Sequence, residues 1–208
     1  MENPWSKIPL DDYESHMSLT SIQQLQALNK LMEGQIMTWP VSSAMILGVA
    51  GGNGLEHIRG SGLKKVYGVD INAAYLSETA RRYQDLNDIV ELLCIDLCSS
   101  PGDLPEAELL IANLVVEYIG CVCFGQVVQQ VNPQYVSCVI QINNGAGWVS
   151  DSPYLHAFDG LEQVYHSIDA NMLHESMTGI GYRFIGNWKY PLPNEKKLVR
   201  LDFMGGIT

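Results

Sequence analysis

Two apolar runs end in residues that could hold a nucleoside. Residues 45–54 read MILGVAGGNG, so an apolar run leads straight into a glycine-rich turn, and a second run over 66–69 ends in Asp70. A strand that stops at glycines can bring its backbone against a ligand, because glycine lacks a Cβ and tolerates positive φ. A carboxylate at the tip of the neighbouring strand can accept hydrogen bonds from both hydroxyls of a ribose. Together these features predict a nucleoside pocket.

The segments around these residues alternate between strand and helix patterns. Apolar residues at helical spacing predict a helix over 18–37, which Trp39 and Pro40 end. Helices are also predicted over 72–86, 117–131 and 161–177, and strands over 44–49, 65–69, 90–95, 109–114 and 135–142. This alternation predicts an α/β fold with a parallel sheet and helices on both faces. Ligands should bind at the carboxyl ends of its strands.

The last third of the chain departs from this alternation. Residues 143–160 form an irregular stretch that is expected to overhang the site on the substrate side. Two β-rich runs, 182–190 and 197–204, finish the chain. The linker between them leaves no room for a crossover helix, so it permits an antiparallel pair.

Composition favours one globular domain over residues 1–208. Apolar residues make up 47% of the chain and charged residues 17%, which excludes a disordered chain or a coiled coil. The net charge of −11 repels nucleic-acid phosphates and anionic lipids, so we expect neither as a partner. The start lacks the order of a secretory signal and no apolar run could span a membrane, which predicts a cytoplasmic protein.

The cysteines and histidines do not follow metal-binding patterns. The cysteines lie mostly within apolar runs, and their spacing lacks the second close pair of a zinc site. We therefore predict no metal and expect buried free thiols, as in a reducing compartment. The residues concerned are Cys94, Cys98, Cys121, Cys123 and Cys138.

From about Ala44 to its end, the sequence resembles the class I S-adenosylmethionine-dependent methyltransferases. In the glycine turn, Gly52 and Gly54 match two of the three alternating glycines of that family. Ala50 stands at the first of the three, and Gly48 stands where the family has an acidic residue. The resemblance implies a Rossmann-like, doubly wound, mostly parallel seven-stranded sheet with an antiparallel C-terminal strand pair. It also implies S-adenosylmethionine as the cofactor.

Three further segments carry the resemblance and imply roles in binding that cofactor. Asp70 resembles the ribose-binding carboxylate of the family, and Ile71 the residue that lies against adenine. Asp96 and Leu97 resemble the segment that recognises the adenine amine and a ring nitrogen. Asn113 begins a looser match, NLVVEY, which lacks the Pro-Pro pattern of members that methylate amino groups. The resemblance thus implies a cofactor site of Gly48, Ala50, Gly52, Gly54, Asp70, Ile71, Asp96, Leu97 and Asn113.

Plainer interpretations of the same residues stay open. Asp70 could cap the helix that follows it, Asp96 could simply begin a loop, and Asn113 could only end a strand. The opening segment 12–17 could fold over the cofactor as a lid, as in the resembled family, or strap the core, within an N-terminal helical cap of residues 1–40.

The expected reaction requires few catalytic residues. Methyl transfer from a sulfonium is an in-line displacement at an already activated carbon, so the protein aligns the reactants and excludes water. A hydroxyl or protonated amine acceptor also needs a base, and His156 and Glu117 are the catalytic candidates. Apolar surface in the lid and loop suits a small or medium-sized organic acceptor. Its expected contacts are Tyr13, His16, Tyr118, Trp148 and Tyr154.

Two other functions stay open at this point. A NAD(P)-dependent oxidoreductase shares the strand-turn-helix geometry, although no tyrosine here is followed four residues later by lysine. A non-catalytic S-adenosylmethionine-binding protein would use the same pocket without a transfer step. The sequence leaves the oligomeric state open.

Overall fold

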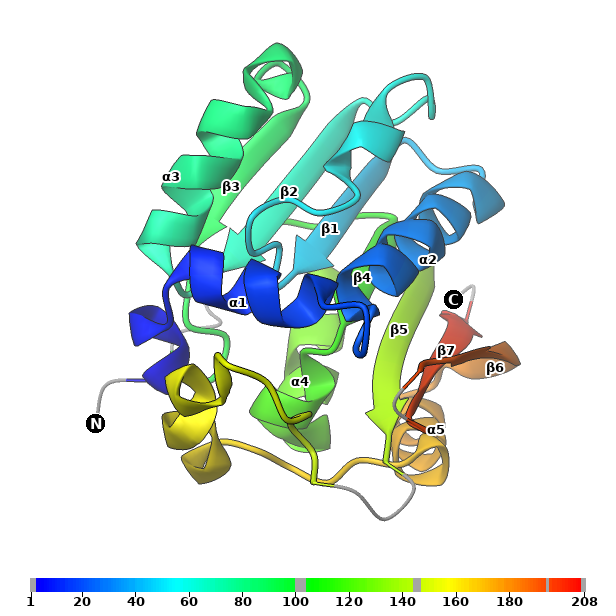
Figure 1. The fold of residues 1–208 in the computed structure, drawn as a ribbon. Coiled ribbons are helices and arrows are strands. Elements are labelled where there is room, and N and C mark those ends of the chain that lie inside the picture. Colours follow the sequence, from blue (N-terminus) through cyan, green and yellow to red (C-terminus); the bar gives the residue numbers. More distant parts are fainter. Residues whose placement is uncertain (1–2, 100–103, 144–146, 194, 207–208) are drawn as a thin grey trace.

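A seven-stranded sheet forms the centre of the computed structural model, which describes residues 3–99, 104–143, 147–193 and 195–206 (Figure 1). The strands are β1 (Ser43–Leu47), β2 (Lys65–Asp70), β3 (Val90–Cys94), β4 (Leu109–Asn113), β5 (Tyr135–Ile142), β6 (Arg183–Pro191) and β7 (Lys197–Met204). Their order across the sheet is β3-β2-β1-β4-β5-β7-β6. Strands β1 to β5 pair in parallel, and β7 pairs antiparallel with β5 and β6. The predicted sheet is confirmed.

The central strands are apolar on both faces, as parallel strands between two helical layers must be. Every residue of β1 after Ser43 is buried, and so are the first four residues of β4. The register pairs Leu47 of β1 with Val69 of β2. This pairing brings Gly48 and Asp70, the next residues of the two segments, to the same edge of the sheet.

Helices cover both faces of the sheet, as predicted. They are α1 (Leu10–Ser18), α2 (Gln24–Thr38), α3 (Ala73–Arg82), α4 (Val116–Val131) and α5 (Ala170–Gly179), with short 3-10 helices η1 (Pro4–Lys7), η2 (Leu55–Ile58), η3 (Gln84–Leu86) and η5 (Leu155–Gln163). Phe124 of α4 and Leu173 of α5 pack on one face of the sheet. Met32 of α2 and Leu76 of α3 pack on the other.

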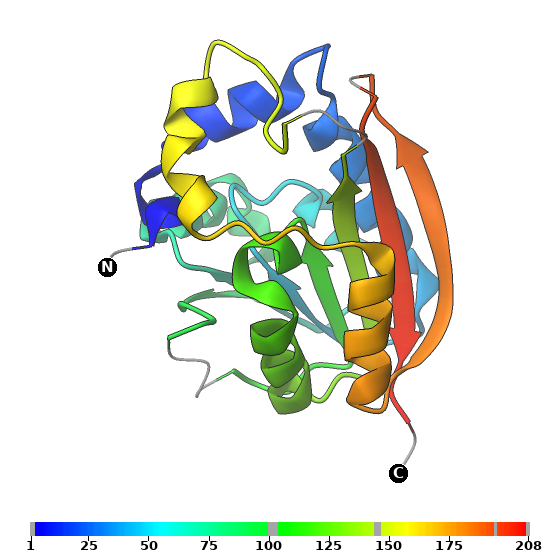
Figure 2. The same ribbon diagram turned by 90° about the horizontal axis from the view of Figure 1, so that it is seen from below.

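The N-terminal elements and η5 meet over the carboxyl ends of the strands. Figure 2 shows α1 beside η5, far from each other in sequence, on the side of the sheet opposite α4 and α5. Ile8, Phe158 and Leu161 form a small buried cluster there, against which Trp5 and Trp148 pack. This cluster attaches the first residues of the chain to the segment that follows β5.

The predicted helix over 18–37 is wrong at its start. One helix, α1, already ends at Ser18, and the next, α2, begins only at Gln24. Gln23 adopts a left-handed conformation with a φ of 54°, which an α-helix does not allow. The apolar spacing therefore continued across a turn that periodicity alone does not show.

The predicted helix over 161–177 is wrong as well, because two helices share its range. The first, η5, ends at Gln163, and α5 begins at Ala170, where the Asp169 side chain accepts hydrogen bonds from two helix amides. Between them the His166 amide donates to the Glu117 carbonyl at 2.6 Å. This tertiary bond and the N-cap of α5 hold residues 164–169 out of helix.

The expectation of buried thiols holds for Cys138 and fails for Cys94 and Cys98, which are exposed. Cys94 ends β3, the edge strand of the sheet, and Cys98 lies in the loop after that strand. Cys121 and Cys123 are partly buried on α4.

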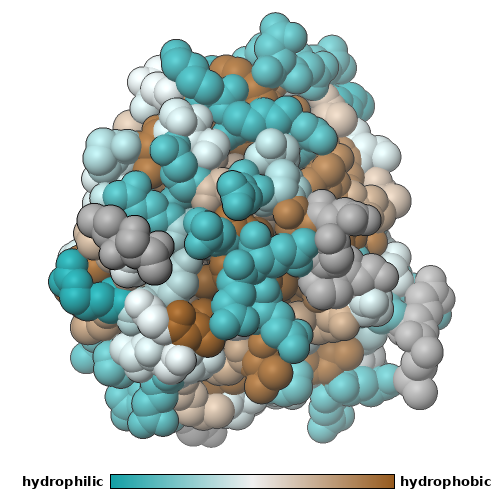
Figure 3. Space-filling model, turned by 180° about the vertical axis from the view of Figure 1, so that it is seen from behind, coloured by the Kyte–Doolittle hydropathy of each residue, from teal (hydrophilic) through white to brown (hydrophobic). Residues whose placement is uncertain are grey.

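The surface mixes hydrophobic and hydrophilic side chains. On the face opposite that of Figure 1, hydrophobic residues form small groups between hydrophilic ones (Figure 3). Exposed large apolar residues include Val122 on α4 and Met172 on α5. Within the described ranges, no helix combines the length and apolar character needed to cross a membrane.

Candidate functional site

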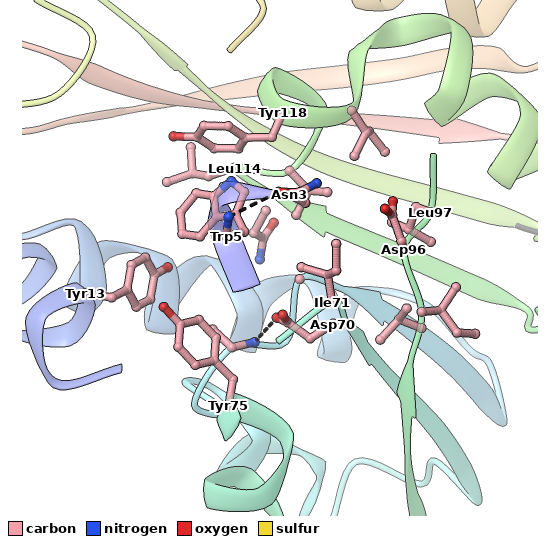
Figure 4. A pocket seen from close by; sticks show the side chains of 17 residues that line it. Asn3, Trp5, Tyr13, Asp70, Ile71, Tyr75, Asp96, Leu97, Leu114 and Tyr118 are labelled. Carbon is pink, nitrogen blue, oxygen red and sulfur yellow. Dashed lines mark hydrogen bonds between the residues drawn. The ribbon is translucent and has the colours of Figure 1, made fainter. Parts of the chain in front are cut away.

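A cavity, here called the main cavity, lies at the carboxyl ends of the central strands, where ligands of such sheets bind. It contains about 700 Å³ of empty space, its open mouth included, which is within the usual range for ligand pockets. Figure 4 shows Trp5 and Tyr118 on one side of it, and Asp70 with Tyr75 on the other. Among its lining residues are seven of the predicted cofactor residues: Gly48, Ala50, Asp70, Ile71, Asp96, Leu97 and Asn113.

Asp70 ends β2 at the main cavity, and its carboxylate joins two loops. Oδ2 accepts a hydrogen bond from the Ala50 amide at 2.9 Å, and Oδ1 accepts one from the Asn72 amide, also at 2.9 Å. Burial raises the pKa of this carboxyl, although the backbone donors act in the opposite direction. Each carboxylate oxygen can accept a second hydrogen bond, so the group can still bind the hydroxyls of a ligand.

Two tyrosines stand on the same side of the main cavity as Asp70. The rings of Tyr13 and Tyr75 stack with their centroids 6.1 Å apart. Tyr75 is only 2% exposed, and its hydroxyl finds no hydrogen-bond partner in the described part of the chain. A buried polar group without a partner costs about 1 to 3 kcal/mol. The cavity therefore fits a polar ligand that gives this hydroxyl a partner.

Gly52 and Gly54 lie outside the linings of the cavities described here. A Cβ at Gly52 would lie 2.6 Å from the ring of Tyr83, and one at Gly54 would lie 2.8 Å from Cγ of Met32. The two glycines thus make room for packing behind the turn. They shape the turn that places Ala50 at the main cavity, without facing the cavity themselves.

Ala50 should tolerate glycine better than Gly52 tolerates alanine. Ala50 has a φ of 47° and Gly52 a φ of 85°, and a left-handed conformation costs an L-residue about 1 to 2 kcal/mol. Ala50→Gly removes that conformational strain from the folded state but raises the conformational entropy of the unfolded chain. The two effects are of similar size, so we expect the free energy of unfolding to change by less than about 1 kcal/mol. Gly52→Ala should lower it by about 2 kcal/mol or more, because Tyr83 must also move. Urea denaturation measures both, and equal losses in the two variants would contradict this account.

A smaller cavity lies beside the glycine turn and brings a carboxylate from α1 against it. Glu14, Gly48 and Asn113 are among its lining residues. The Glu14 carboxylate binds the Arg82 guanidinium through both oxygens, and Arg82 also donates to the Gly51 carbonyl at 3.1 Å. An acidic side chain thus stands near Gly48, although position 48 itself carries none.

Asp96 and Asn113 are each held by neighbouring groups at the rim of the main cavity. Oδ1 of Asp96 accepts a hydrogen bond from the Cys98 amide at 3.0 Å. This bond stabilises the turn in the loop after β3. Asn113 and Gln35 of α2 exchange two amide hydrogen bonds, each 2.9 Å long. Because Gln35 is fully buried, this pair fixes the end of β4 against α2.

A second cavity, here called the aromatic chamber, adjoins the main cavity. It contains about 600 Å³ of empty space, and Trp5, Tyr13, Leu114 and Tyr118 line both cavities. Leu114 has a φ of 55°, a left-handed conformation at the junction of the two cavities, where such strain is typical of functional sites. The aromatic side chains that line the chamber are Trp5, Tyr13, Tyr118, Trp148, Phe158 and Tyr165.

Glu117, in the first turn of α4, lines the aromatic chamber. Its side chain is only 3% exposed; Oε1 accepts from the Gln141 amide at 2.8 Å, and Oε2 has no partner among the residues that the structure describes. Burial raises the pKa of this carboxyl from its ordinary 4.5 to about 7. A carboxyl that titrates near neutral pH in a cavity is suited to accept a proton there.

His16 lines the aromatic chamber from α1. Its Nδ1 lies 2.7 Å from the Ser152 hydroxyl, and its ring lies 4.7 Å from that of Phe158. Burial, with a smaller contribution from Lys196, lowers the pKa of His16 to about 4. The ring is therefore neutral at physiological pH.

Asn72 attaches the N-terminal segment to the edge of the main cavity. It caps α3 by accepting from the Ala74 and Tyr75 amides, so Asn72 fills the capping role that the sequence left open for Asp70. Its Nδ2 also donates to the Trp5 carbonyl at 3.0 Å and to the Ile8 carbonyl at 3.4 Å.

Asn72→Asp should release that segment while it keeps the cap, because aspartate retains the accepting oxygen and lacks the NH₂ donor. We expect amide hydrogen exchange over residues 4–9 to become at least about tenfold faster, as for the loss of about 1.4 kcal/mol of local stability. Exchange in α3 should stay within about threefold of wild type. Unchanged exchange over 4–9 would show that these two bonds do not hold the segment.

One predicted catalytic residue, His156, and one predicted acceptor contact, Tyr154, lie away from the cavities. His156 is exposed, with 92% of its side chain accessible, and pairs with Asp159 at 3.3 Å. Tyr154 packs against the cluster of Ile8 and Phe158 and is absent from the linings of both cavities. Residues 144–146 of the predicted loop lie outside the described residues.

Other lining residues were not singled out in the sequence. Trp5 lies before the first predicted helix, and Tyr165 lies in a range predicted as helix. Tyr75 offered one signal, since it is the third residue after Asn72 and so falls in the first turn of a helix that begins beside the cavity. The other two offered none.

No protein-family model matches the sequence, and no curated protein matches it either. Solved structures match the fold. The N-methyltransferase NodS from Bradyrhizobium japonicum WM9, in complex with S-adenosyl-L-homocysteine, is 10% identical with a TM-score of 0.69, and the match covers 98% of this chain and 99% of that one. Geranyl diphosphate C-methyltransferase from Streptomyces coelicolor A3(2) is 12% identical with a TM-score of 0.67, over 88% and 81% of the two chains. The [4+2]-cyclase SpnF is 11% identical with a TM-score of 0.67, over 89% and 83%.

The chain therefore has the fold of the class I S-adenosylmethionine-dependent methyltransferases, and the resemblance of its sequence to them is confirmed at the level of the fold. One structural neighbour is described as a cyclase. Because one fold can support several reactions, the function of this chain has to be argued from its own site.

Proposed function

We propose that this protein is an S-adenosylmethionine-dependent methyltransferase that acts on a small or medium-sized organic acceptor by in-line transfer. The observation that carries the proposal is the meeting of two cavities at Trp5, Tyr13, Leu114 and Tyr118. One cavity has the groups for a nucleoside, and the other is lined by Glu117, whose buried Oε2 has no partner among the residues described in the structure. A donor in the first and an acceptor in the second would face each other across the junction.

The residues of the main cavity fit the cofactor, which supplies an activated methyl group when bound. Asp70 would accept hydrogen bonds from the ribose hydroxyls, and the buried hydroxyl of Tyr75 would gain a partner that the described part of the chain does not give it. Ile71 and Leu97 would lie against the adenine, with Asp96 near its amine. Solved neighbours contain S-adenosylmethionine or S-adenosyl-L-homocysteine, which supports this assignment.

Glu14 would take the place of the acidic residue that the glycine turn lacks at position 48. Its carboxylate reaches the smaller cavity beside that turn from α1, and Arg82 holds it there. A carboxylate in this place would attract the ammonium group of the cofactor's amino-acid part. The acidic function would thus come from a lid helix and not from the strand end.

Glu117 is the group that we assign as proton acceptor in place of His156. It is buried in the aromatic chamber, and the raised pKa of its carboxyl leaves it partly ionised at neutral pH. The segment 1–40 would act as the lid of a single catalytic domain, with Trp5, Tyr13 and His16 as its contacts to the two cavities.

The first test is cofactor binding. Asp70→Asn should weaken the binding of S-adenosyl-L-homocysteine about 10- to 100-fold, which corresponds to about 1 to 3 kcal/mol for hydrogen bonds to a charged group. Isothermal titration calorimetry of both proteins measures this, with circular dichroism to show that the variant is folded. Unchanged affinity would remove Asp70 from the cofactor site, and wild-type binding of NAD in preference to S-adenosyl-L-homocysteine would replace the proposal with an oxidoreductase.

The second test is turnover of a labelled methyl group from S-adenosylmethionine against a panel of amines, alcohols, phenols and thiols. Transfer to a member of the panel is the expected result. Tight binding of the cofactor without transfer to any of these classes would instead favour the non-catalytic binding protein.

A further inference from the structure

The aromatic chamber combines one carboxylate with walls of aromatic rings. Glu117 lines the chamber, and its Oε2 is buried and without a partner in the described part of the chain. The described residues that line it include no lysine and no arginine. Its one histidine, His16, carries no charge at neutral pH because burial lowers its pKa to about 4. When Glu117 is ionised, the chamber therefore holds a negative charge with no positive side chain on its lining.

Three of the rings that line the chamber with Glu117 come from segments far apart in sequence. Tyr118 is the next residue on α4, and Trp148 and Tyr165 stack on each other with centroids 4.5 Å apart at 17°. The centroid of Tyr118 lies 6.4 Å from Trp148 and 6.2 Å from Tyr165, with the planes inclined by more than 60°. Aromatic faces attract cations, and a set of such rings is how proteins recognise ammonium ligands.

The polar groups behind Glu117 keep its carboxylate in place without neutralising it. The Gln141 amide donates to Oε1 at 2.8 Å, and the Gln141 side chain bonds Gln24 and donates to the Trp148 carbonyl at 2.8 Å. These are neutral groups. A cationic ligand that reached Oε2 would bring a positive charge to an oxygen that has no partner among the described residues, which would offset the cost of burying the carboxylate.

We propose that the aromatic chamber binds an organic ammonium group against Glu117 and the rings of Tyr118, Trp148 and Tyr165, and that the methyl acceptor is therefore an amine. The second half of this statement rests on the proposed methyltransferase function, whereas the first half does not. A carboxylate or phosphate acceptor would lie against Glu117 with no lysine or arginine among the described lining residues to stabilise it, so we expect anionic compounds to bind poorly in the chamber.

The transfer balances with the groups present. The ammonium gives one proton to Glu117 Oε2, which frees a lone pair on nitrogen. That lone pair forms the new N–C bond to the methyl carbon, while the C–S bond breaks and its electron pair stays on sulfur. The product leaves as a methylammonium ion, and Glu117 returns its proton to the solvent.

The binding half is tested with a probe that needs no cofactor and undergoes no reaction. Benzyltrimethylammonium, benzyl alcohol and benzoate share a ring and carry a positive, a neutral and a negative group. Titration calorimetry at pH 8 should show the cation binding at least about tenfold more tightly than the alcohol, with no measurable binding of benzoate. Glu117→Gln and Trp148→Leu should each weaken the cation at least about tenfold and leave the alcohol within about threefold.

A matched control separates the chamber carboxylate from the overall negative charge. Glu162→Gln removes one charge from an exposed position of η5 and should leave the cation affinity within about twofold. Equal binding of the cation and the alcohol, or a Glu117→Gln variant that binds the cation like wild type, would overturn the inference. Loss of cation binding in Glu162→Gln as large as in Glu117→Gln would overturn it too, because the attraction would then be a property of the whole surface.

Parallel titrations with S-adenosyl-L-homocysteine separate this inference from the proposed function. Cofactor binding without cation selectivity would leave a methyltransferase whose acceptor is not an amine. Cation selectivity without cofactor binding would support the ammonium site and overturn the methyltransferase. The two failures are thus distinguishable in the same preparation of protein.

Discussion

Glu117→Gln should lower kcat for methyl transfer by about 10²- to 10⁴-fold, the usual contribution of a positioned general base. Glutamine keeps the shape of the side chain and can still accept from the Gln141 amide, but it takes no proton. The acceptor for this assay is the compound that the methyl-transfer panel identifies. Binding of S-adenosyl-L-homocysteine should stay within about threefold of wild type, because Glu117 lines the aromatic chamber and is absent from the lining of the main cavity.

The pH profile of kcat should carry the signature of the same carboxyl. Activity is expected to fall as the pH drops below about 7, where Glu117 takes up a proton. The other ionisable groups on the chamber are His16, whose pKa is about 4, and Tyr13, Tyr118 and Tyr165, whose pKa values burial raises above the usual 10. Lys196 lies beside the chamber, where its Nζ donates to the Trp148 carbonyl at 3.0 Å and burial lowers its pKa to about 8. None of these groups titrates between about pH 5 and about pH 7, so the residual activity of Glu117→Gln should be flat over that range.

His156→Gln tests the other base that the sequence offered. The exposed position of His156 predicts activity within about twofold of wild type. A large loss in this variant, together with an active Glu117→Gln protein, would show that the loop folds over the acceptor and would exchange the roles of the two residues.

The largest expected effect on stability comes from the same carboxyl. Removing its charge should lower activity but raise the stability of the folded protein. The pKa of Glu117 is about 7 in the folded protein against an ordinary value of 4.5, so between these pH values the folded state holds a proton that the unfolded state has lost. Folding is therefore favoured below pH 4.5 and becomes less favourable as the pH rises to 7. Above pH 7 the full cost applies, about 3 kcal/mol at 1.36 kcal/mol for each pKa unit.

Glu117→Gln should accordingly stabilise the protein, and more so at alkaline pH. Between pH 5.5 and pH 8.5, the difference in free energy of unfolding between variant and wild type should grow by about 2 kcal/mol in favour of the variant. Urea denaturation at the two pH values measures it, and Glu162→Gln provides a surface control that should change by less than about 0.5 kcal/mol. A difference between variant and wild type that stays constant with pH would mean that Glu117 does not titrate in this range.

The sheet was predictable because its signals are local. The range predicted for β5, 135–142, is the range observed, and the strand over 65–69 extends by one residue to Asp70. Buried parallel strands need unbroken apolar runs, and such runs are visible without knowledge of their partners. The errors fell where a helical pattern crossed a turn, at Gln23 and at residues 164–169, because periodicity does not register a single left-handed residue or a tertiary hydrogen bond.

The cofactor side of the site was largely predictable. On the other side the sequence indicated five residues that line the aromatic chamber, Tyr13, His16, Glu117, Tyr118 and Trp148, and missed Trp5 and Tyr165. Gly48, Ala50, Asp70 and Asp96 occupy strand ends and the turns after them, so the topology brings them together. Trp5 reaches the chamber from the N-terminal segment, and Tyr165 reaches it from the non-helical connection before α5. No pattern in the sequence relates either residue to Glu117.

By itself, the sequence determined the order of strands and helices, and with it the edge of the sheet where Gly48 and Asp70 meet, since burial patterns and strand-end glycines act through neighbours in the chain. The tertiary structure decided that the side chains lining the aromatic chamber meet around one cavity and which of them carry a charge there. Glu117 is one of 23 acidic residues in the sequence, and nothing in its type distinguishes it from the others. Its pKa of about 7 arises from desolvation by residues distant in the chain, a property of the packed environment that exists only after folding.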